Sequence, residues 1–278
     1  MRIALFTVEG LPNARALRQF IHDHADEIVY IGASDTHRAQ VGGALGQVKA
    51  HLSRSGIWIV PYLFVNFCLM EITRLFFSLL RPILPQRHIQ EIPIEELCKS
   101  HNIPIHYLIN VNHKSVIEAM TEAHVDIIIS FHFDQIFKNK ILNSVPLGGI
   151  NVHPALLPHH RGPFPTFHAL MAHDPLFGVT VHKLAAKIDA GNILEQTRMV
   201  LSPDITATRS AMVLFDEGRL CVERLLNTIK STGEMPQGRP YPITAYYPWP
   251  SHEDMAKFYG MGRRMVNLGD VCEAISVS

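Results

Sequence analysis

The sequence is poor in cysteine and lacks the residue spacings that usually hold a metal ion. Its four cysteines lie far apart, at positions 68, 98, 221 and 272, and they form no C-x-x-C pair. Because disulfide frameworks and zinc sites need paired or closely spaced cysteines, we expect free thiols in a reducing, cytoplasmic environment. The 17 histidines include the pair His159–His160, but its spacing from His153 and His168 matches no common ligand pattern, so no metal is expected.

The sequence also lacks an excess of charge and a glycine-rich turn. Lys and Arg number 25, Asp and Glu also number 25, and no basic cluster stands out, which gives no support for electrostatic binding of nucleic acids. The turn after the first apolar segment, TVEGLPNARAL, holds a single glycine. Binding of NAD or FAD needs a G-x-G-x-x-G turn, and a Walker loop is absent as well, so we expect neither activity.

Short apolar segments alternate with helical segments along the chain. Strands are predicted at 2–7, 27–34, 103–108, 125–131 and 148–153, followed by a hairpin of 177–184 and 190–201. Helices are predicted over 13–24, near 114–123 and over 205–230, the last with Asp204 as its N-cap. The strand–helix–strand spacing indicates parallel pairing, and the apolar strands indicate burial on both faces. We therefore expect an α/β fold with a doubly wound, mostly parallel sheet.

A charge-free segment, GIWIVPYLFVNFCLM at 56–70, lies between the second and third predicted strands. A transmembrane helix needs about 20 consecutive apolar residues, whereas this run has 15 residues and contains Pro61 and Asn66. Polar residues then recur at helical spacing. We predict a helical insertion over about 50–90 that packs on the rest of the fold.

The domain organisation follows from these segments. We expect a catalytic domain at 1–234 that includes the insertion, and an extended C-terminal arm at 235–278, rich in proline and aromatic residues, that packs on it. An alternative for the insertion stays open: part of 56–80 is exposed and serves as a homodimer interface or a peripheral contact with a membrane or a lipid-linked acceptor. Its natural anchors would be Trp58, Tyr62, Phe64 and Phe67.

Three polar residues follow apolar strands in a way that suggests a catalytic site. Asn151 and His153 are two residues apart, so they share one face of a strand that Pro154 ends, and Asp189 lies in the turn KIDAGNI after a later strand. An amide, an imidazole and a carboxylate at strand ends suit the addition of a nucleophile to a carbonyl group. The simpler alternative is a core histidine beside a turn asparagine. No Ser or Cys nucleophile elbow is present, so the substrate would supply the nucleophile.

The ordered segments GGINVHPALLPHHRGPFP, GVTVHKL and KIDAGNIL resemble the N-x-H-x-x-L-L-P…R-G, G-x-T/S-x-H and D-x-G blocks of the folate-dependent formyltransferases. The resemblance implies a Rossmann-like fold and formyl transfer from 10-formyltetrahydrofolate to a primary amine. It implies a catalytic trio of Asn151, His153 and Asp189, in which Asp189 raises the pKa of a protonated His153. The residues it implies for folate binding are Phe133, Gln135, Ile136, Phe137, Leu156, Leu157, Pro158 and Ile188.

Departures from the family pattern bear on the acceptor. The first turn lacks the Gly-Ser-Asn phosphate cradle of the glycinamide-ribonucleotide enzyme, and Ala155 stands where the methionyl-tRNA enzyme has Ser. His132 stands where the family often has Gly, which would narrow the folate slot or change its contacts. We therefore favour an amino sugar, linked to a nucleotide, as the acceptor. The alternatives are a 10-formyltetrahydrofolate hydrolase, a methionyl-tRNA formyltransferase-like enzyme and a non-catalytic folate-binding protein.

Overall fold

The structure, a computed structural model, describes residues 1–35, 43–80, 92–202 and 204–276. Its strands are β1 (Ile3–Thr7), β2 (Ile28–Ser34), β3 (Ile105–Leu108), β4 (Ile127–Phe131), β5 (Gly149–His153), β6 (Phe177–Lys183) and β7 (Ile193–Met199). Its helices are α1 (Ala14–Asp23), α2 (Gly43–Ser55), α3 (Val60–Leu63), α4 (Leu69–Leu80), α5 (Ile94–Ser100), α6 (Lys114–Glu122), α7 (Asn139–Leu142), α8 (Pro165–Leu170), α9 (Ala207–Thr232), α10 (His252–Gly260) and α11 (Leu268–Ser276). A 3₁₀ turn, η2 (Ile57–Ile59), and a π-helical turn, η3 (Phe64–Cys68), adjoin α3.

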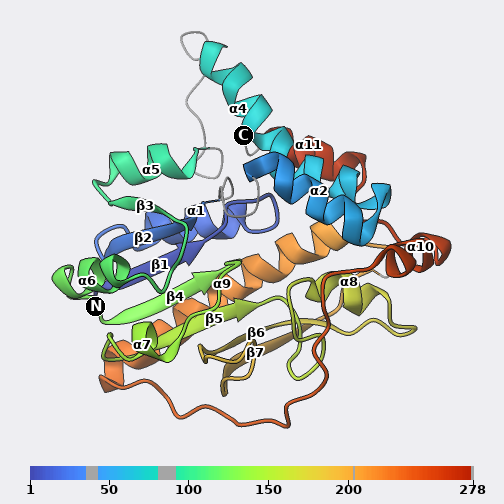
Figure 1. Ribbon diagram of the computed structural model, residues 1–278. Coiled ribbons are helices and arrows are strands. Elements are labelled where there is room, and N and C mark those ends of the chain that lie inside the picture. The colour runs from blue at the N-terminus through green and yellow to red at the C-terminus, as the bar shows by residue number, and fades with distance from the viewer. Residues whose placement is uncertain (36–42, 81–91, 203, 277–278) are drawn as a thin grey trace.

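The strands form one seven-stranded sheet in the order β3-β2-β1-β4-β5-β6-β7 (Figure 1). The first five strands in this order are parallel, and β6 and β7 are added antiparallel at one edge. The sheet is therefore mixed and mostly parallel, as the sequence predicts. The hairpin of β6 and β7 was also predicted, because its two alternating segments are joined by a short loop that contains Gly191.

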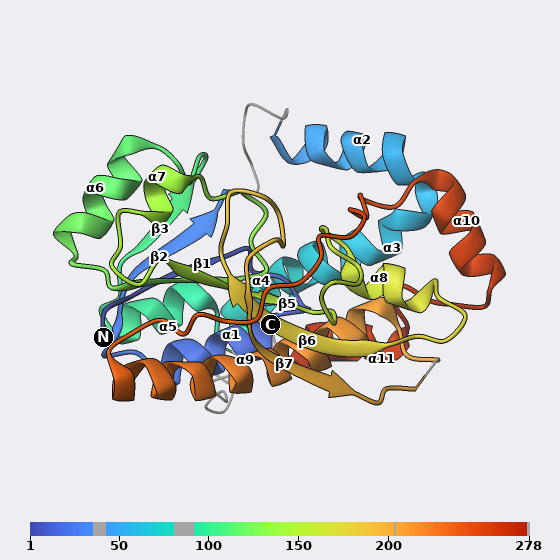
Figure 2. The same cartoon turned by 90° about the horizontal axis from the view of Figure 1, so that it is seen from below.

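Helices cover both faces of the sheet (Figure 2). On one face α1, α5 and α9 pack on side chains such as Leu5, Ile129 and Ile150. On the other face α6 and α7 pack on alternate side chains such as Phe6 and Ile128. Since successive strand residues point to opposite faces, both sets of side chains are apolar, and this explains the nearly continuous apolar strands of the sequence.

Two details of the predicted elements are wrong. The N-cap of α9 is Thr206, whose hydroxyl accepts a hydrogen bond from the backbone of Arg209, and not Asp204. The C-terminal arm is extended only as far as the start of α10, because Ser251 and Asp254 form a capping box that begins this helix. The short helices α7 and α8 were not predicted either, since four to six residues carry too little periodicity.

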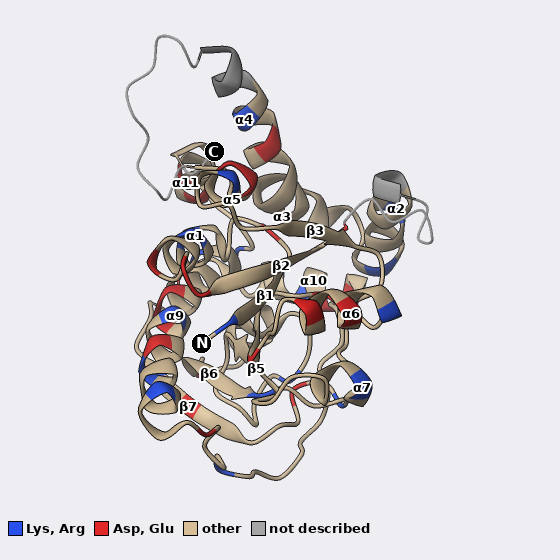
Figure 3. Ribbon diagram, turned by 90° about the vertical axis from the view of Figure 1, so that its left-hand side faces the viewer, with Lys and Arg blue, Asp and Glu red and all other residues tan. Residues whose placement is uncertain are grey.

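The insertion predicted over about 50–90 is helical over 50–55 and 57–80, and its 81–90 portion lies outside the described residues. One side of η2 to η3 packs on the core through Ile59, Tyr62 and Val65. The other side leaves apolar groups in solvent, among them Ile57, Trp58, Phe64, Ile72 and Leu75. Helix α3 carries no charged residue (Figure 3). The described part of the chain has one segment, Ile57–Leu75, that is long and apolar enough to span a membrane by composition, and 28% of it is buried.

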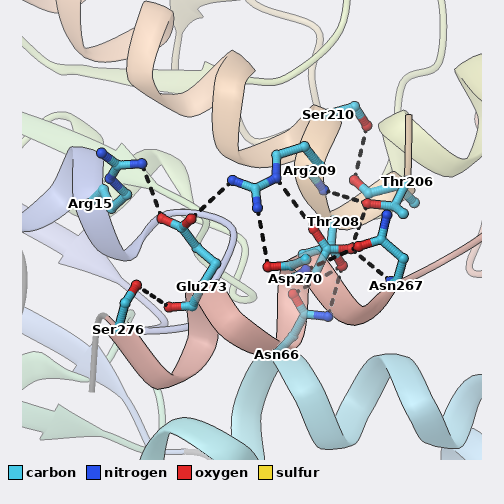
Figure 4. A network of polar contacts seen from close by, with 12 residues as sticks. Arg15, Asn66, Thr206, Thr208, Arg209, Ser210, Asn267, Asp270, Glu273 and Ser276 are labelled. Carbon is cyan, nitrogen blue, oxygen red and sulfur yellow. Dashed lines mark hydrogen bonds and ion pairs between the residues drawn. The ribbon is translucent and has the colours of Figure 1, made fainter. Parts of the chain in front are cut away.

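The C-terminal helix α11 is joined to the core by a network of polar contacts (Figure 4). Asp270, which is fully buried, accepts a hydrogen bond from the Thr206 hydroxyl (2.7 Å) and pairs with Arg209. Glu273 pairs with both Arg209 and Arg15, at 3.1 and 3.0 Å. The C-terminal extension therefore packs on the rest of the chain through charge pairs, of which only Asp270 is fully buried, as well as through apolar contacts, and the boundary at 234 stays a prediction.

Candidate active site

Neighbouring antiparallel strands bring three polar side chains together. Asn151 and His153 lie on β5, and β6 pairs with it so that Asn151 faces His182 and His153 faces Thr180. Asn151, His153 and His182 line a cavity of about 290 Å³ at the carboxyl ends of β4 and β5. A parallel α/β sheet commonly binds ligands at this edge, and the structure brings Asn151 and His153 together there.

Asp189 reaches this cavity from the loop after β6. Its backbone has a φ of +43°, and its carbonyl accepts hydrogen bonds from Arg161 Nε (2.9 Å) and the Tyr241 hydroxyl (2.5 Å). Its carboxylate accepts another from the backbone N–H of Gly162 (2.8 Å). Gly191 allows the loop to turn, because a Cβ there would lie 1.9 Å from the carbonyl oxygen of Lys183. The loop and the C-terminal arm together hold Asp189 in place.

The hydrogen bonds of the two imidazoles fix where their protons lie. His153 donates from Nε2 to the carbonyl of His160 (3.1 Å), which leaves Nδ1 to face Asp189 Oδ1 at 3.7 Å. His182 donates from Nδ1 to the carbonyl of Lys183 (2.8 Å), which leaves Nε2 at 3.5 Å from the same oxygen. In their neutral forms both rings therefore direct an unprotonated nitrogen toward the carboxylate. Asp189 would stabilise a proton arriving on either ring.

Burial sets the charge of the site. It lowers the pKa of His153, and it outweighs Asp189, which raises that pKa. The effect of Asp189 has the direction that the sequence argument expects, but the ring is 4% exposed and desolvation of the cation has the larger effect, so His153 is neutral in the free protein. Burial by itself would raise the pKa of Asp189, but the nearby imidazoles of His153 and His182 and the hydrogen bond from the Gly162 N–H together lower it well below its usual range. Next to the Asp189 carboxylate, His153 is therefore neutral.

His182 is a site residue that the sequence argument did not identify. It belongs to the segment GVTVHKL, where it alternates with Thr180, and its role depends on the antiparallel register of β6 with β5. Its Nε2 accepts a hydrogen bond from the side-chain amide of Asn151 (3.2 Å). The sequence signal for His182 was its position two residues after Thr180, since both are polar residues on one face of an otherwise apolar strand.

Five of the predicted folate-binding residues lie together. Phe133, Gln135, Ile136, Phe137 and Ile188 all line the cavity that also contains the predicted catalytic trio. The side chain of Gln135 is held by Ser34, Leu108 and Val111, so its amide serves mainly to shape the loop. The surface that remains is largely apolar, with backbone groups between aromatic rings, and it suits a flat heteroaromatic ring.

His132 contributes to the same wall. Its φ of +50° lies in the left-handed region, which explains why glycine suits this position. The imidazole donates to the carbonyl of Val8 (3.3 Å) and stacks on Phe67 of the insertion, with ring centroids 6.3 Å apart. Burial lowers the pKa of His132, so the ring is neutral. The ring lines the cavity, and its effect on the width or contacts of a folate slot stays a prediction.

The structure does not bring Leu156, Leu157 and Pro158 to the cavity lining. The backbone N–H of Leu157 instead donates to Thr180 (3.1 Å), and its carbonyl accepts from Gln196 (3.0 Å). The carbonyl of Pro158 accepts from Thr244 of the C-terminal arm. These three residues join strands and arm behind the site, and no contact with the cavity supports a direct role in folate binding.

No group of three or more potential metal ligands occurs within the described ranges of the chain. The polar side chains that meet at the site are the Asn151 amide, the imidazoles of His153 and His182, and the Asp189 carboxylate. Such a set stabilises an oxyanion and accepts a proton.

Comparisons with known proteins agree with this geometry. The chain matches the formyl transferase family model over residues 85–225, just over half of its length. A phosphoribosylglycinamide formyltransferase from Streptococcus pneumoniae has a similar fold, with a TM-score of 0.54, 14% identity and coverage of 82% of this chain and 98% of that one. For a sugar N-formyltransferase from a Shewanella species the corresponding values are 0.53, 17%, 99% and 88%.

A third similar structure is that of WlaRD, a sugar 3N-formyltransferase solved in the presence of dTDP and 5-N-formyl-THF. Its TM-score is 0.53 at 16% identity, and the match covers 89% of this chain and 69% of that one. At such identities the three structures establish the fold alone. Together with the family model and the arrangement of Asn151, His153 and Asp189 at the strand ends, they show that the chain belongs to the formyl transferase family.

Proposed function

We propose that the protein transfers a formyl group from 10-formyltetrahydrofolate to a primary amine, and that its acceptor is an amino sugar linked to a nucleotide. The observation that carries the proposal is the convergence of Asn151, His153, His182 and Asp189 on one cavity whose other wall is apolar and aromatic. The family supports formyl transfer, and the apolar, aromatic wall supports a folate donor because such a surface suits a pterin ring.

Asn151 stabilises the negative charge that develops on the formyl oxygen when the amine attacks. One hydrogen of its side-chain amide is engaged by His182 Nε2, which orients the group, and the second hydrogen remains for the oxyanion. A donor that is already oriented needs no reorganisation during the reaction, and such donors typically supply about 3–4 kcal/mol.

Asp189 and the imidazoles accept the proton that the amine loses. Nδ1 of His153 faces the carboxylate with a lone pair, so a proton on this nitrogen would lie between two acceptors. His153, neutral because of its burial, takes the proton as a general base, and Asp189 stabilises the resulting cation. The same proton then returns to the folate nitrogen as the carbon–nitrogen bond to the donor breaks, which balances the transfer.

The amino-sugar acceptor is supported by what the chain lacks and by the fold. The turn after β1 has no Gly-Ser-Asn cradle, and sugar N-formyltransferases of similar fold cover nearly the whole chain. Among the similar structures, WlaRD was solved with dTDP, the nucleotide part of such an acceptor. A nucleotide on the acceptor is therefore part of the proposal for the present chain.

Release of tetrahydrofolate from 10-formyltetrahydrofolate tests the function. We expect release that depends on an added nucleotide-linked amino sugar and a formylated sugar as the product. Release without any amine would indicate a hydrolase. If 10-formyltetrahydrofolate neither binds nor reacts, the donor assignment is wrong.

A further inference from the structure

The insertion occupies the place where a phosphate would otherwise meet the first helix of the fold. In α/β proteins the turn between the first strand and helix offers backbone N–H groups to anions. Here the N–H of Gly10 donates to the Asn13 side chain (3.1 Å), and the N–H of Leu11 donates to the carbonyl of Asn66 in the π-helical turn η3 (3.0 Å). Pro12 has no N–H. The turn has none left for a ligand at these positions.

Side chains of the insertion also pack against this turn between β1 and α1. A Cβ at Gly10 would lie 2.9 Å from the ring of Phe67, so this turn is in van der Waals contact with the insertion. Asn66 is fully buried, and its side-chain amide donates to the Tyr62 carbonyl (2.8 Å) and pairs with Thr208 on α9 (Figure 4). The insertion is therefore fixed to the core at this point and cannot be displaced by a weakly bound anion.

The nearby cations are neutralised as well. Glu9 pairs with Arg18, which is fully buried, at 2.8 Å, and with Arg74 of the insertion. Burial by itself would raise the pKa of Glu9, but the two guanidinium groups together lower it, so the carboxylate is charged. Glu71 also pairs with Arg74, at 2.6 Å, so two carboxylates balance the two guanidinium groups and leave no net positive charge there to attract a phosphate.

The cavity itself has an acidic and aromatic lining. Among the described residues that line it, the charged ones are Asp134 and Asp189, and none is Lys or Arg. Tyr62 of the insertion lines the cavity and packs edge-on against Phe164, with ring centroids 4.8 Å apart. Phe164 in turn stacks on Trp249 of the C-terminal arm at 4.7 Å. An anionic group would be desolvated there beside two carboxylates, whereas an uncharged ring would pack on aromatic faces.

We propose that the insertion makes the cavity select an amine carried on an uncharged ring, with Tyr62 as the specificity-determining residue and every phosphate of the acceptor held outside the cavity. This inference rests on the proposed formyl transfer and specifies its acceptor. A nucleotide-linked amino sugar meets this requirement when only its sugar ring enters the cavity and its phosphates stay outside.

The first test uses the wild-type protein with saturating 5-formyltetrahydrofolate. D-Glucosamine and D-glucosamine 6-phosphate form a matched pair that differs in one phosphate, and pyrophosphate serves as an anion probe beside an ionic-strength control. We expect the phosphorylated amine to bind at least about tenfold more weakly than its partner, and pyrophosphate to leave the melting temperature at the control value. Tighter binding of the phosphorylated amine, or protection by pyrophosphate that the amine competes away, would overturn the inference.

The second test concerns Tyr62 itself. Tyr62→Ala is expected to raise the acceptor KM about tenfold through loss of the aromatic contact, and Tyr62→Phe to leave it near the wild-type value. Phe64→Ala, on the exposed side of the same helical segment, is the matched control. An unchanged KM in folded Tyr62→Ala would remove Tyr62 from the proposal. Binding of 5-formyltetrahydrofolate is measured separately in each variant, so a failure of the donor assignment is distinguished from a failure of this inference.

Discussion

The side-chain amide of Asn151 donates a hydrogen bond to Nε2 of His182 across two neighbouring strands, at 3.2 Å. This contact orients the amide toward the cavity and ties the oxyanion donor to an imidazole that lies 3.5 Å from Asp189. The four polar groups of the site therefore form one connected unit. Removing any one of them changes the position or the charge of the others.

Substitution Asn151→Ala is expected to lower kcat about 10²–10³-fold, the loss typical of removing one oxyanion donor. Because Asn151 is proposed to act on the transition state, binding of 5-formyltetrahydrofolate should stay at the wild-type level. Single-turnover kinetics and a binding titration measure the two quantities. A kcat within a few fold of wild type would contradict the role of Asn151.

His153→Ala and Asp189→Asn are expected to be severe individually and far from additive in combination, since the imidazole and the carboxylate handle one proton together. We expect the double variant to be about as slow as the slower single variant. His182→Phe tests the contact with Asn151 and should lower kcat as well. Simple multiplication of the two single effects would show that His153 and Asp189 act independently.

The sequence predicted much of this fold because the signals are local. Strands such as 2–7 and 148–153 consist of apolar residues between clear turns, and the structure places them within one or two residues of the prediction. Asn151 and His153 could be found in the same way, because residues two apart on a strand share a face. Asp189 could be found from its position in a turn that follows a strand.

The features of the fold and the site that were not predicted depend on contacts between segments far apart in the sequence. The role of His182 follows from the strand register, and the hydrogen bond from Leu11 to Asn66 joins a turn to an insertion more than 50 residues away. The charge of His153 depends on how deeply the fold buries it, which local sequence does not reveal. Leu156, Leu157 and Pro158 were assigned to the folate site from a motif, whereas their contacts are with Thr180, Gln196 and the arm.

The folate slot can be tested at Ile136, whose side chain lines the cavity and is 49% exposed. Millimolar 5-formyltetrahydrofolate should raise the melting temperature of the wild type by several degrees, because a ligand of the native state stabilises it by mass action. Ile136→Asp should abolish this increase. Ile109→Asp is the matched control, since Ile109 is 50% exposed and does not line the cavity. Equal shifts in both variants would remove 131–137 from the slot.

Stability should fall in mild acid because of His160. Burial, followed by the neighbouring histidines, lowers the pKa of His160 to about 4, and its Nδ1 has no partner among the described residues. Between this value and the ordinary pKa of 6.5 the unfolded chain binds the proton and the folded protein does not. The contribution of His160 is therefore present above pH 6.5 and is lost as the pH falls toward 4.

We expect this one residue to lower the free energy of unfolding by about 1–2 kcal/mol between pH 7 and pH 5, allowing for its partial exposure. Urea denaturation at both pH values measures the loss, and His160→Phe should reduce it by that amount. His24, whose pKa is raised through Glu223 and Glu27 despite burial, acts in the opposite direction in both proteins and cancels in the comparison. The same pH dependence in His160→Phe and wild type would contradict the assignment.

The exposed side of the insertion gives a last prediction. Ile57 and Leu75 are each 70% exposed, and Phe64 lies between them on the same helical segment, whose mean hydropathy is 1.3. The preceding helix α2 carries Lys49 and Arg54 and no acidic residue. An exposed apolar stripe beside basic residues is typical of a helix that lies on an anionic membrane surface. We therefore expect the protein to float with vesicles that contain anionic lipid, and Phe64→Asp to weaken this binding while formyl transfer in solution continues.

Flotation that is unchanged in Phe64→Asp would place the contact elsewhere. If light scattering shows a dimer that Phe64→Asp dissociates, the stripe is an interface between two copies. If the protein is a monomer that does not bind vesicles, the insertion has a role only in packing and in shaping the acceptor cavity.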